Sequence, residues 1–347
     1  MARSVIVLLL WAGSSLAAQA PADTGRRASR LFDATEPLSI TLTANFGAVG
    51  RDRDTVDSRK KPHPAILTVT GPSGDTVTLH VNLKTRGHYR LATCGYPPLK
   101  IEFDKDSIAG SVFAHEGNLK LVGQCRGGQS WMNYLLEEYL LYRVYQLVTP
   151  MSFRVRLAHV TYADSAGKKA PDIRYAFFLE DDSRLARRNH TKLLEVKGLN
   201  QGQLDSAQMG VVGTFEYMIG NTDWSVGALH NIVLVQDSAS FATYPVPYDF
   251  DWSGVIWAPY ANPDSRLPIH TVRERLYRSY CRTPAELAPS FAAFNAVKDS
   301  IYALYRGQAD LEPKRVKQAL DYYDEFYVTI NDPRKARRAF IDGCVTG

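Results

Sequence analysis

Apolar and polar positions alternate along several short segments in the first half of the chain, and this period of two predicts β-strands. Turn-forming residues, such as the run from Gly71 to Asp75, separate consecutive segments. We therefore expect this half to be mostly antiparallel β-structure. The predicted strands cover residues 38–44, 65–70, 76–83, 97–103, 118–122, 153–162 and 174–179.

Residues 129–148 form the strongest predicted helix, which ends before Pro150. Apolar side chains occur nearly all round it, so it should be buried. Glu138 lies among these apolar neighbours, and its carboxylate needs either a charged partner or a route past the aromatic rings to solvent. Further helices are predicted at 204–219 and over most of 284–339.

Three acidic residues and an asparagine gather between residues 221 and 254. Asp223 follows a predicted helix, and Asn231 opens a strand at 232–235. Asp249 and Asp251 follow on the second arm of the expected hairpin, where strand alternation would turn both to one side. Oxygen ligands of this kind suit a divalent cation, so the stretch predicts a metal and phosphate site. The alternative is a hydrogen-bonded hairpin with capping carboxylates.

A phosphate site also needs a cation from the first half of the chain. Lys120, in the centre of a predicted strand, could pair with Glu138 and stay charged, and Lys100 in the preceding strand is the alternative. Arg86 and Arg90 flank a glycine in a loop that could lie over phosphates.

The first twenty residues have the form of a signal peptide, with an apolar run at 5–12 and a small-x-small cleavage site at 18–20. Residues 21–36 are expected to be a linker. No later stretch reaches the roughly 20 apolar residues of a membrane span. We therefore expect an exported protein, in the periplasm or outside the cell of a bacterium.

Composition and cysteine usage narrow the classes of partner. The net charge of +5 over 347 residues is small, and no basic block interleaves with aromatics, which disfavours nucleic acid. An even number of cysteines without a CxxC pair favours disulfides over zinc. The preferred pairing is Cys94 with Cys125 and Cys281 with Cys344, and the other two connectivities remain open.

The order of these motifs resembles the CotH kinase-like family, atypical kinases of the wider protein-kinase-like fold. An Arg-Gly segment precedes a lysine-bearing strand and a helix, and a later strand ends near Glu180. Exported, uncharacterised bacterial members share similar Pro-Pro-Leu, Arg-Val-Arg-Leu and Tyr-Asp-Phe-Asp segments. The remaining matching motifs are Asn221-Thr222-Asp223, His230-Asn231 and Asp249-Phe250-Asp251 with Gly254.

The resemblance implies an α+β, two-lobed protein-kinase-like fold, with a β-rich N-terminal lobe at 37–182 and a mainly helical C-terminal lobe at 183–347. It implies ATP with Mg²⁺ or Mn²⁺, and transfer of the γ-phosphoryl group to a hydroxyl of a small molecule or of a cell-envelope or secreted protein. By position, Asp223 would be the catalytic base. The metal ligands would be Asn231, Asp249 and Asp251, and the nucleotide-binding residues Lys120, Lys100, Glu138, Arg86 and Glu180.

One departure separates the chain from that pattern. Asn231 follows Asp223 at a longer interval than the metal-binding asparagine of kinase catalytic loops. A non-catalytic pseudokinase or binding module of the cell envelope is therefore the alternative. A metal-dependent phosphoesterase is a third reading, disfavoured because two-metal sites usually carry more His and Asp ligands.

Overall fold

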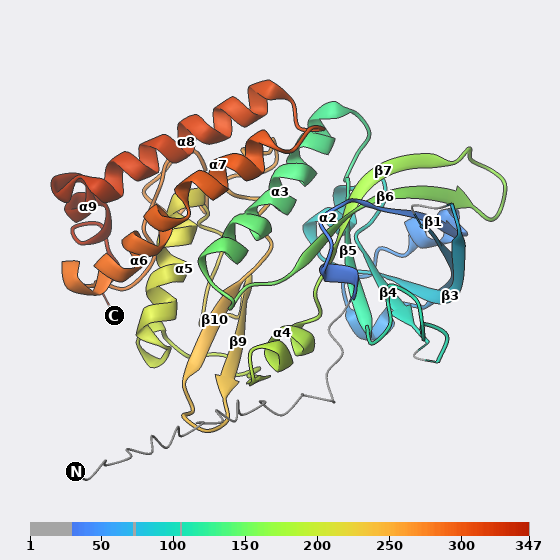
Figure 1. Cartoon of the computed structure of the whole chain (residues 1–347), viewed down its shortest axis with the longest axis horizontal. Helices are drawn as coiled ribbons and strands as arrows, with labels where there is room; N and C mark the ends of the chain where they lie inside the picture. The colour runs from blue at the N-terminus through green and yellow to red at the C-terminus, as the bar shows by residue number, and fades with distance from the viewer. Residues whose placement is uncertain (1–29, 72–73, 105, 347) are drawn as a thin grey trace, which may run out of the picture.

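A closed β-barrel forms one end of the molecule and a group of helices forms the other (Figure 1). The computed structural model describes residues 30–71, 74–104 and 106–346, so the predicted signal peptide and most of the predicted linker lie outside the described residues. The barrel strands are β1 (Leu38–Ala44), β2 (His63–Thr70), β3 (Thr76–Thr85), β4 (Leu99–Phe103), β5 (Asn118–Gly123), β6 (Val155–Asp164) and β7 (Asp172–Leu179).

The expected two-lobed kinase-like fold with an antiparallel β-sheet is wrong. The strand order is β1-β2-β3-β4-β5-β7-β6, and the sheet closes because β1 pairs in parallel with β6, from Leu38 opposite Ala158 to Ala44 opposite Asp164. Local alternation indicates which residues form a strand and which face turns inward, but not which strand lies next to it. Closure also leaves the barrel without a free edge.

The helices and a small second sheet make up the rest of the described chain. The sheet has the order β10-β9-β8, with β8 (Thr191–Leu193), β9 (Ile232–Asp237) and β10 (Thr243–Pro247). The helices are α1 (Phe46–Arg51), α2 (Tyr89–Thr93), α3 (Gln129–Val148), α4 (Asp182–Arg188), α5 (Ser206–Ile219), α6 (Pro284–Ala296), α7 (Lys298–Arg306), α8 (Pro313–Asn331) and α9 (Pro333–Phe340). No helix among the described residues is long and apolar enough to cross a membrane.

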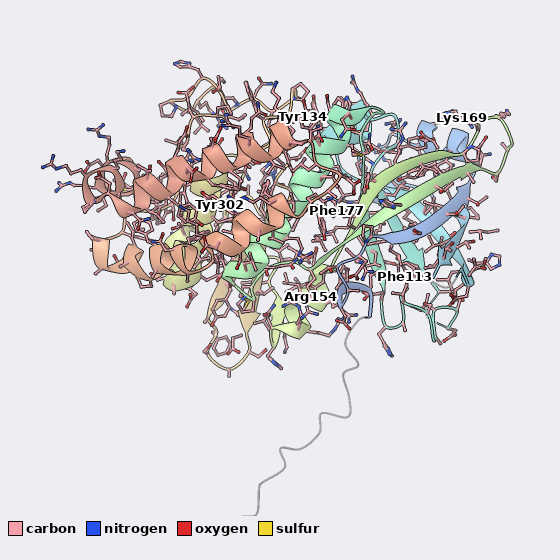
Figure 2. The ribbon with its side chains drawn as sticks, turned by 45° about the horizontal axis from the view of Figure 1, so that its top comes forward. Phe113, Tyr134, Arg154, Lys169, Phe177 and Tyr302 are labelled. Carbon is pink, nitrogen blue, oxygen red and sulfur yellow. A yellow bond between two sulfur atoms is a disulfide. The ribbon has the colours of Figure 1, made fainter. Side chains whose placement is uncertain are left out.

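Helix α3 confirms the predicted buried helix and lies between the barrel and the other helices (Figure 1). The molecule has two apolar cores, one inside the barrel and one around α3 and the C-terminal helices. Strand β7 belongs to both cores, because Phe177 (labelled in Figure 2) packs in the helical core and Phe178 in the barrel core, and both are fully buried. The two ends of the molecule are thus joined through a common layer of side chains.

Both disulfides of the preferred pairing are present, which confirms that prediction. Cys94 at the end of α2 is joined to Cys125 in the segment between β5 and α3, and Cys281 before α6 is joined to Cys344 near the C-terminus. Such bonds persist in oxidising surroundings and fit an exported protein.

Closure of the barrel by β1 can be tested by shortening a side chain inside it. Leu42 is fully buried, so Leu42→Ala is expected to lower the free energy of unfolding by about 2 to 5 kcal/mol, measured by denaturant titration. Thr41 lies on the outer face of the same strand, and Thr41→Ala is the matched control, expected to cost less than about 1 kcal/mol. Equal effects of the two substitutions would contradict this arrangement of β1.

Candidate functional site

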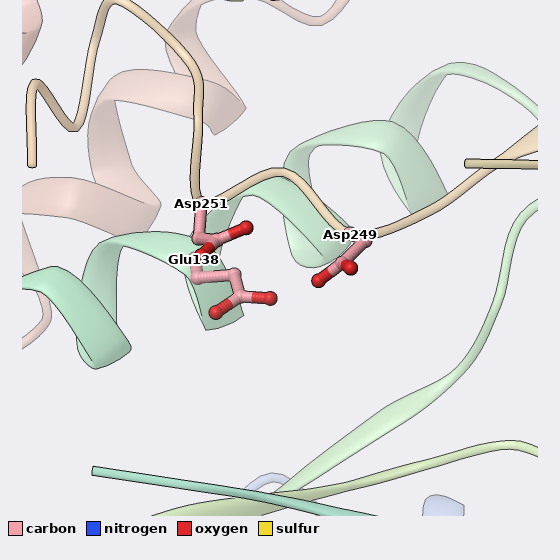
Figure 3. A group of neighbouring side chains, drawn as sticks. All are labelled: Glu138, Asp249 and Asp251. Atoms are coloured by element: carbon pink, nitrogen blue, oxygen red, sulfur yellow. The ribbon is translucent and has the colours of Figure 1, made fainter. Parts of the chain in front are cut away.

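Three carboxylates from two distant parts of the chain point toward one another (Figure 3). Glu138 comes from α3, and Asp249 and Asp251 come from the segment after β10. One oxygen of each lies within 4.8 Å of the others. The side chains of Glu138 and Asp251 are 2% and 6% exposed, whereas that of Asp249 is 35% exposed. Asp249 is therefore the member of the acidic triad that a ligand in solution reaches first.

Phe250 holds the two aspartates in place. It is fully buried, with its ring 4.7 Å from the ring of Tyr142 and 5.3 Å from that of Phe215. The expected strand alternation is wrong here, because β10 ends at Pro247 and Asp249 has a left-handed backbone, with φ of 63°. The Asp249 backbone N–H donates to the hydroxyl of Tyr142 at 2.9 Å, so that contact and the buried ring direct the two carboxylates together.

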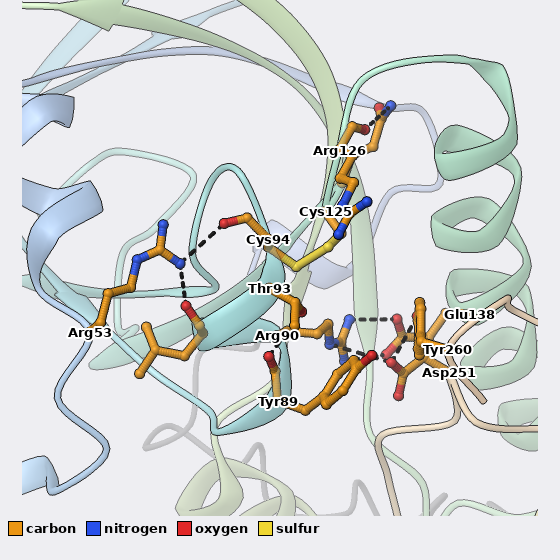
Figure 4. Close-up of a disulfide and its surroundings, with 12 residues drawn as sticks. Arg53, Tyr89, Arg90, Thr93, Cys94, Cys125, Arg126, Glu138, Asp251 and Tyr260 are labelled. Carbon is orange, nitrogen blue, oxygen red and sulfur yellow. Dashed lines mark hydrogen bonds and ion pairs between the residues drawn. A yellow bond between two sulfur atoms is a disulfide. The ribbon is translucent and has the colours of Figure 1, made fainter. Parts of the chain in front are cut away.

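Arg90 is the cation that pairs with the acidic triad (Figure 4). Its guanidinium donates to both oxygens of Glu138, at 2.9 and 3.2 Å, and also to Asp249. Its Nε lies 3.5 Å from Asp251, whose carboxylate also accepts a hydrogen bond of 2.9 Å from Tyr260. The expectation that Glu138 needs a partner is thus met, by an arginine in place of Lys120 or Lys100.

The two predicted lysines lie on the outer face of the barrel. Lys120 forms an ion pair of 2.7 Å with Asp182 and sits over the ring of Tyr248, 5.3 Å from its centroid. Lys100 lies directly opposite Lys120 in the β4–β5 ladder. Lys120 still acts on the site, because its charge contributes to lowering the pKa of Asp249.

The other two predicted nucleotide-binding residues, Arg86 and Glu180, lie in different places. Arg86 follows β3 and lines a pocket of about 530 Å³ together with Arg90 and Asp249. Glu180 is buried at the end of β7, where Arg188 contacts both of its oxygens at 2.9 and 3.0 Å. That ion pair joins α4 to the barrel and lies apart from the lining of this pocket.

Asp223 lines the same pocket from another side. Helix α5 ends at Gly220, whose φ of 69° reverses the chain, and an added Cβ there would lie 2.1 Å from the Tyr322 hydroxyl. The buried Asn221 then accepts a hydrogen bond of 3.0 Å from the Asp223 backbone N–H. The turn therefore presents a half-exposed carboxylate at a defined place.

His230 and Asn231 hold the Asp223 side chain. His230 Nε2 lies 2.9 Å from Asp223 Oδ1, and the Asn231 amide donates to Asp223 Oδ2 at 3.1 Å and to its backbone carbonyl at 2.7 Å. The predicted metal ligand Asn231 thus belongs to the Asp223 group, and only its amide oxygen could serve a cation. The acidic triad contains Glu138 in its place.

Three residues of the pocket lining have a strained backbone. Leu229, Asn231 and Asp249 all have φ between 52° and 63°, a region that residues with a side chain rarely adopt. Such conformations persist where surrounding contacts impose them, and they cluster at ligand sites.

The charges in the triad are unevenly balanced, since one arginine faces three acids. Burial raises the pKa of Asp251 to about 8, and although Arg90 opposes the shift, Asp249 and Glu138 add to it. Burial also raises the pKa of Glu138, against the effect of Arg90. Burial disfavours the charge on Asp249, but Arg90 and Arg86 outweigh it and hold its pKa below the ordinary value. A cation bound beside these groups would favour the charged forms of Glu138 and Asp251 and so lower their pKa values.

No protein-family model matches this chain, and no curated protein matches it significantly. The resemblance to the CotH kinase-like family therefore remains an expectation from the motifs.

The Cys94–Cys125 disulfide explains how Arg90 is positioned. Arg90 lies on the short helix α2, and the disulfide ties the end of α2 to the segment that leads into α3, the helix of Glu138 (Figure 4). A five-residue helix has little stability of its own, so the covalent bond and the ion pairs fix it together.

The raised pKa of Asp251 predicts a pH dependence of stability. Because the folded-state pKa of about 8 exceeds the ordinary aspartate value of 3.8, the folded protein binds the extra proton, and stability is lost as pH rises between these values. The melting temperature of the protein in EDTA is expected to fall between about pH 5 and 8. Asp251→Asn should flatten this slope, while Asp321→Asn, at an exposed position on α8, should not. An unchanged slope in Asp251→Asn would contradict the assignment.

Proposed function

We propose that the pocket binds a nucleoside triphosphate, ATP, with Mg²⁺ or Mn²⁺, and transfers the γ-phosphoryl group to a hydroxyl presented at Asp223. The observation that carries this proposal is the composition of one pocket of about 530 Å³. It brings together Asp249 and Asp251, the cations Arg86 and Arg90, and the separate carboxylate Asp223. Phosphoryl transfer needs these three kinds of group.

The acidic triad fits a divalent cation by its donor atoms and by its charge. Its ligands are carboxylate oxygens, which Mg²⁺ and Mn²⁺ prefer, and a bound cation would oppose the rise that burial, with Asp249 and Glu138, gives the pKa of Asp251. Asp249 and Asp251 would hold the cation, while Glu138 stays paired with Arg90. A bound cation would neutralise the phosphate oxygens.

Positive side chains around Asp249 suit the triphosphate. Arg86 lines the pocket, and both Arg86 and Lys120 lower the pKa of Asp249, which places their charges within electrostatic reach of its carboxylate. Lys100 extends this positive strip along the barrel as the neighbour of Lys120. Arg90 orients Glu138 and Asp249, and its charge lowers the pKa of both carboxyl groups against the effect of burial.

Asp223 is suited to receive the proton of the acceptor. In the proposed step, the hydroxyl oxygen forms a bond to the γ-phosphorus, the bond from that phosphorus to the β,γ-bridging oxygen breaks, and ADP leaves with the electron pair. The hydroxyl proton passes to Asp223. Hydrogen bonds from His230 and Asn231 hold this carboxylate without burying it.

The motifs that resemble the CotH kinase-like family support the same activity, because Asp223 and Asp249 come from two of them and line one pocket. Only the activity of that family is proposed for this chain, because its barrel differs from the kinase-like fold. With the predicted signal peptide and the two disulfides, we place the protein in the periplasm or outside the cell, with an acceptor in the cell envelope or on a secreted protein.

Ligand binding without catalysis is the second candidate. It is favoured by Arg90, which already contacts Glu138, Asp249 and Asp251 and so balances part of their charge without a metal. A pseudoenzyme of this kind would bind a phosphate-bearing ligand at Arg86 and Arg90 and would transfer nothing.

The two candidates differ in their dependence on a metal and on Asp223. For a phosphotransferase, ATP should raise the melting temperature by several degrees only when Mg²⁺ or Mn²⁺ is present, and Asp249→Ala should abolish the shift. Asp223→Asn should keep the shift and lower transfer of label from γ-labelled ATP at least 100-fold, since it removes the proton acceptor.

Asp321→Ala, an exposed carboxylate on α8, controls for the loss of an acidic side chain and should leave both measurements unchanged. An ATP shift without metal and without transfer would favour the non-catalytic candidate. No shift with any nucleotide would overturn both.

A further inference from the structure

Two more pockets adjoin the pocket of about 530 Å³ that Asp249 and Asp251 of the acidic triad line, which we call the triad pocket. A pocket of about 700 Å³ shares Asp223, His230 and Trp252 with it, and a third of about 300 Å³ shares Trp224 and Arg278 with the second. Shared walls place the three side by side, and we call the second and third together the acceptor groove. Asp223 stands where this groove meets the triad pocket.

Aromatic side chains recur along the acceptor groove. Trp252 lies at its junction with the triad pocket and Tyr280 lines the far part, and both are partly exposed, whereas Trp224 between the two parts is buried. Trp252 is partly exposed, and its ring meets that of Tyr89 at 5.7 Å and 85°, so the two rings form a corner. Partly exposed aromatic faces, here those of Trp252 and Tyr280, can pack against the C–H faces of sugar rings.

The charged side chains that line the acceptor groove, Arg266, Arg278 and Asp264, have neighbours of opposite charge. Arg266 forms an ion pair with Asp264, with Nε 2.9 Å from Oδ1. Arg278 donates to the backbone carbonyls of Thr222 and Trp224, and its charge is met by those of Asp264 and Asp223. Recognition of an acidic or phosphorylated peptide uses clusters of arginines with no acid beside them. A neutral ligand rich in hydroxyls fits this groove better.

We propose that the acceptor groove binds a neutral saccharide chain and presents one of its hydroxyls to Asp223. The presentation rests on the proposed phosphotransfer, because Asp223 would take the hydroxyl proton as the sugar oxygen bonds to phosphorus and ADP leaves. Binding of the saccharide does not rest on it, since the groove lies beside the triad pocket and needs neither ATP nor metal.

Binding can be measured on the full chain by isothermal titration in EDTA. The probes are neutral hexasaccharides of the glucan, mannan and chitin types, in α- and β-linked forms, and a serine-rich peptide of similar length. At least one hexasaccharide should bind, and the peptide should not. Binding of the peptide alone, or of none of the probes, would overturn the proposal.

A matched pair of substitutions localises the binding. Asn262 is exposed and lines only the acceptor groove among the three pockets, so Asn262→Trp should fill it and weaken saccharide affinity at least 10-fold. Asn118→Trp, at an exposed position at the start of β5, should retain the affinity. Equal affinities of the two variants would overturn the assignment of the groove.

The metal-dependent ATP shift distinguishes this proposal from the proposed function. Asn262→Trp should retain the shift, because Asn262 is not part of the triad pocket. Saccharide binding by a protein that shows no ATP shift would uphold the groove and overturn phosphotransfer. An ATP shift without saccharide binding would overturn the assignment of the groove and leave the proposed phosphotransfer standing.

Discussion

Arg90 lies half-buried among three carboxylates, and its single charge makes the burial of Glu138 and Asp251 tolerable. An uncompensated buried carboxylate costs several kcal/mol, so this ion group also constrains the parts of the chain that supply it. It joins α2 beside the barrel, α3 between the two ends of the molecule, and the segment after β10. The same group that holds the structure together supplies the three carboxyl groups of the proposed cation site.

Rigid surroundings maintain this arrangement. The disulfide at Cys94 fixes α2, the buried Phe250 fixes the two aspartates, and α3 is held between two cores. A group of charges in a flexible loop would rearrange or take up water, whereas here the covalent bond and the packed rings prevent both. Asp223 is held separately by its own hydrogen bonds, so Asp223 and the two aspartates of the triad face one pocket from independent supports.

Local sequence patterns predicted the elements of this fold well and their partners poorly. The helix at 129–148 and the barrel strands follow from periodicity, and the cysteine pairing followed from order along the chain. The parallel contact of β1 with β6 has no local signal, because it joins segments far apart in sequence. For the same reason Glu138 was expected to pair with a strand lysine. Arg90 was visible only as one of two arginines beside a glycine, although its place four residues before Cys94 links it to the disulfide that positions it.

The central claim, that the acidic triad is a cation site for a bound nucleotide, is tested most directly by a crystal structure with Mn²⁺ and a non-hydrolysable ATP analogue. Anomalous diffraction should place manganese within about 2.5 Å of oxygens of Asp249 and Asp251, with the Arg90–Glu138 ion pair intact. Manganese bound elsewhere, or a nucleotide bound at Arg86 and Arg90 with no metal at the triad, would contradict the account.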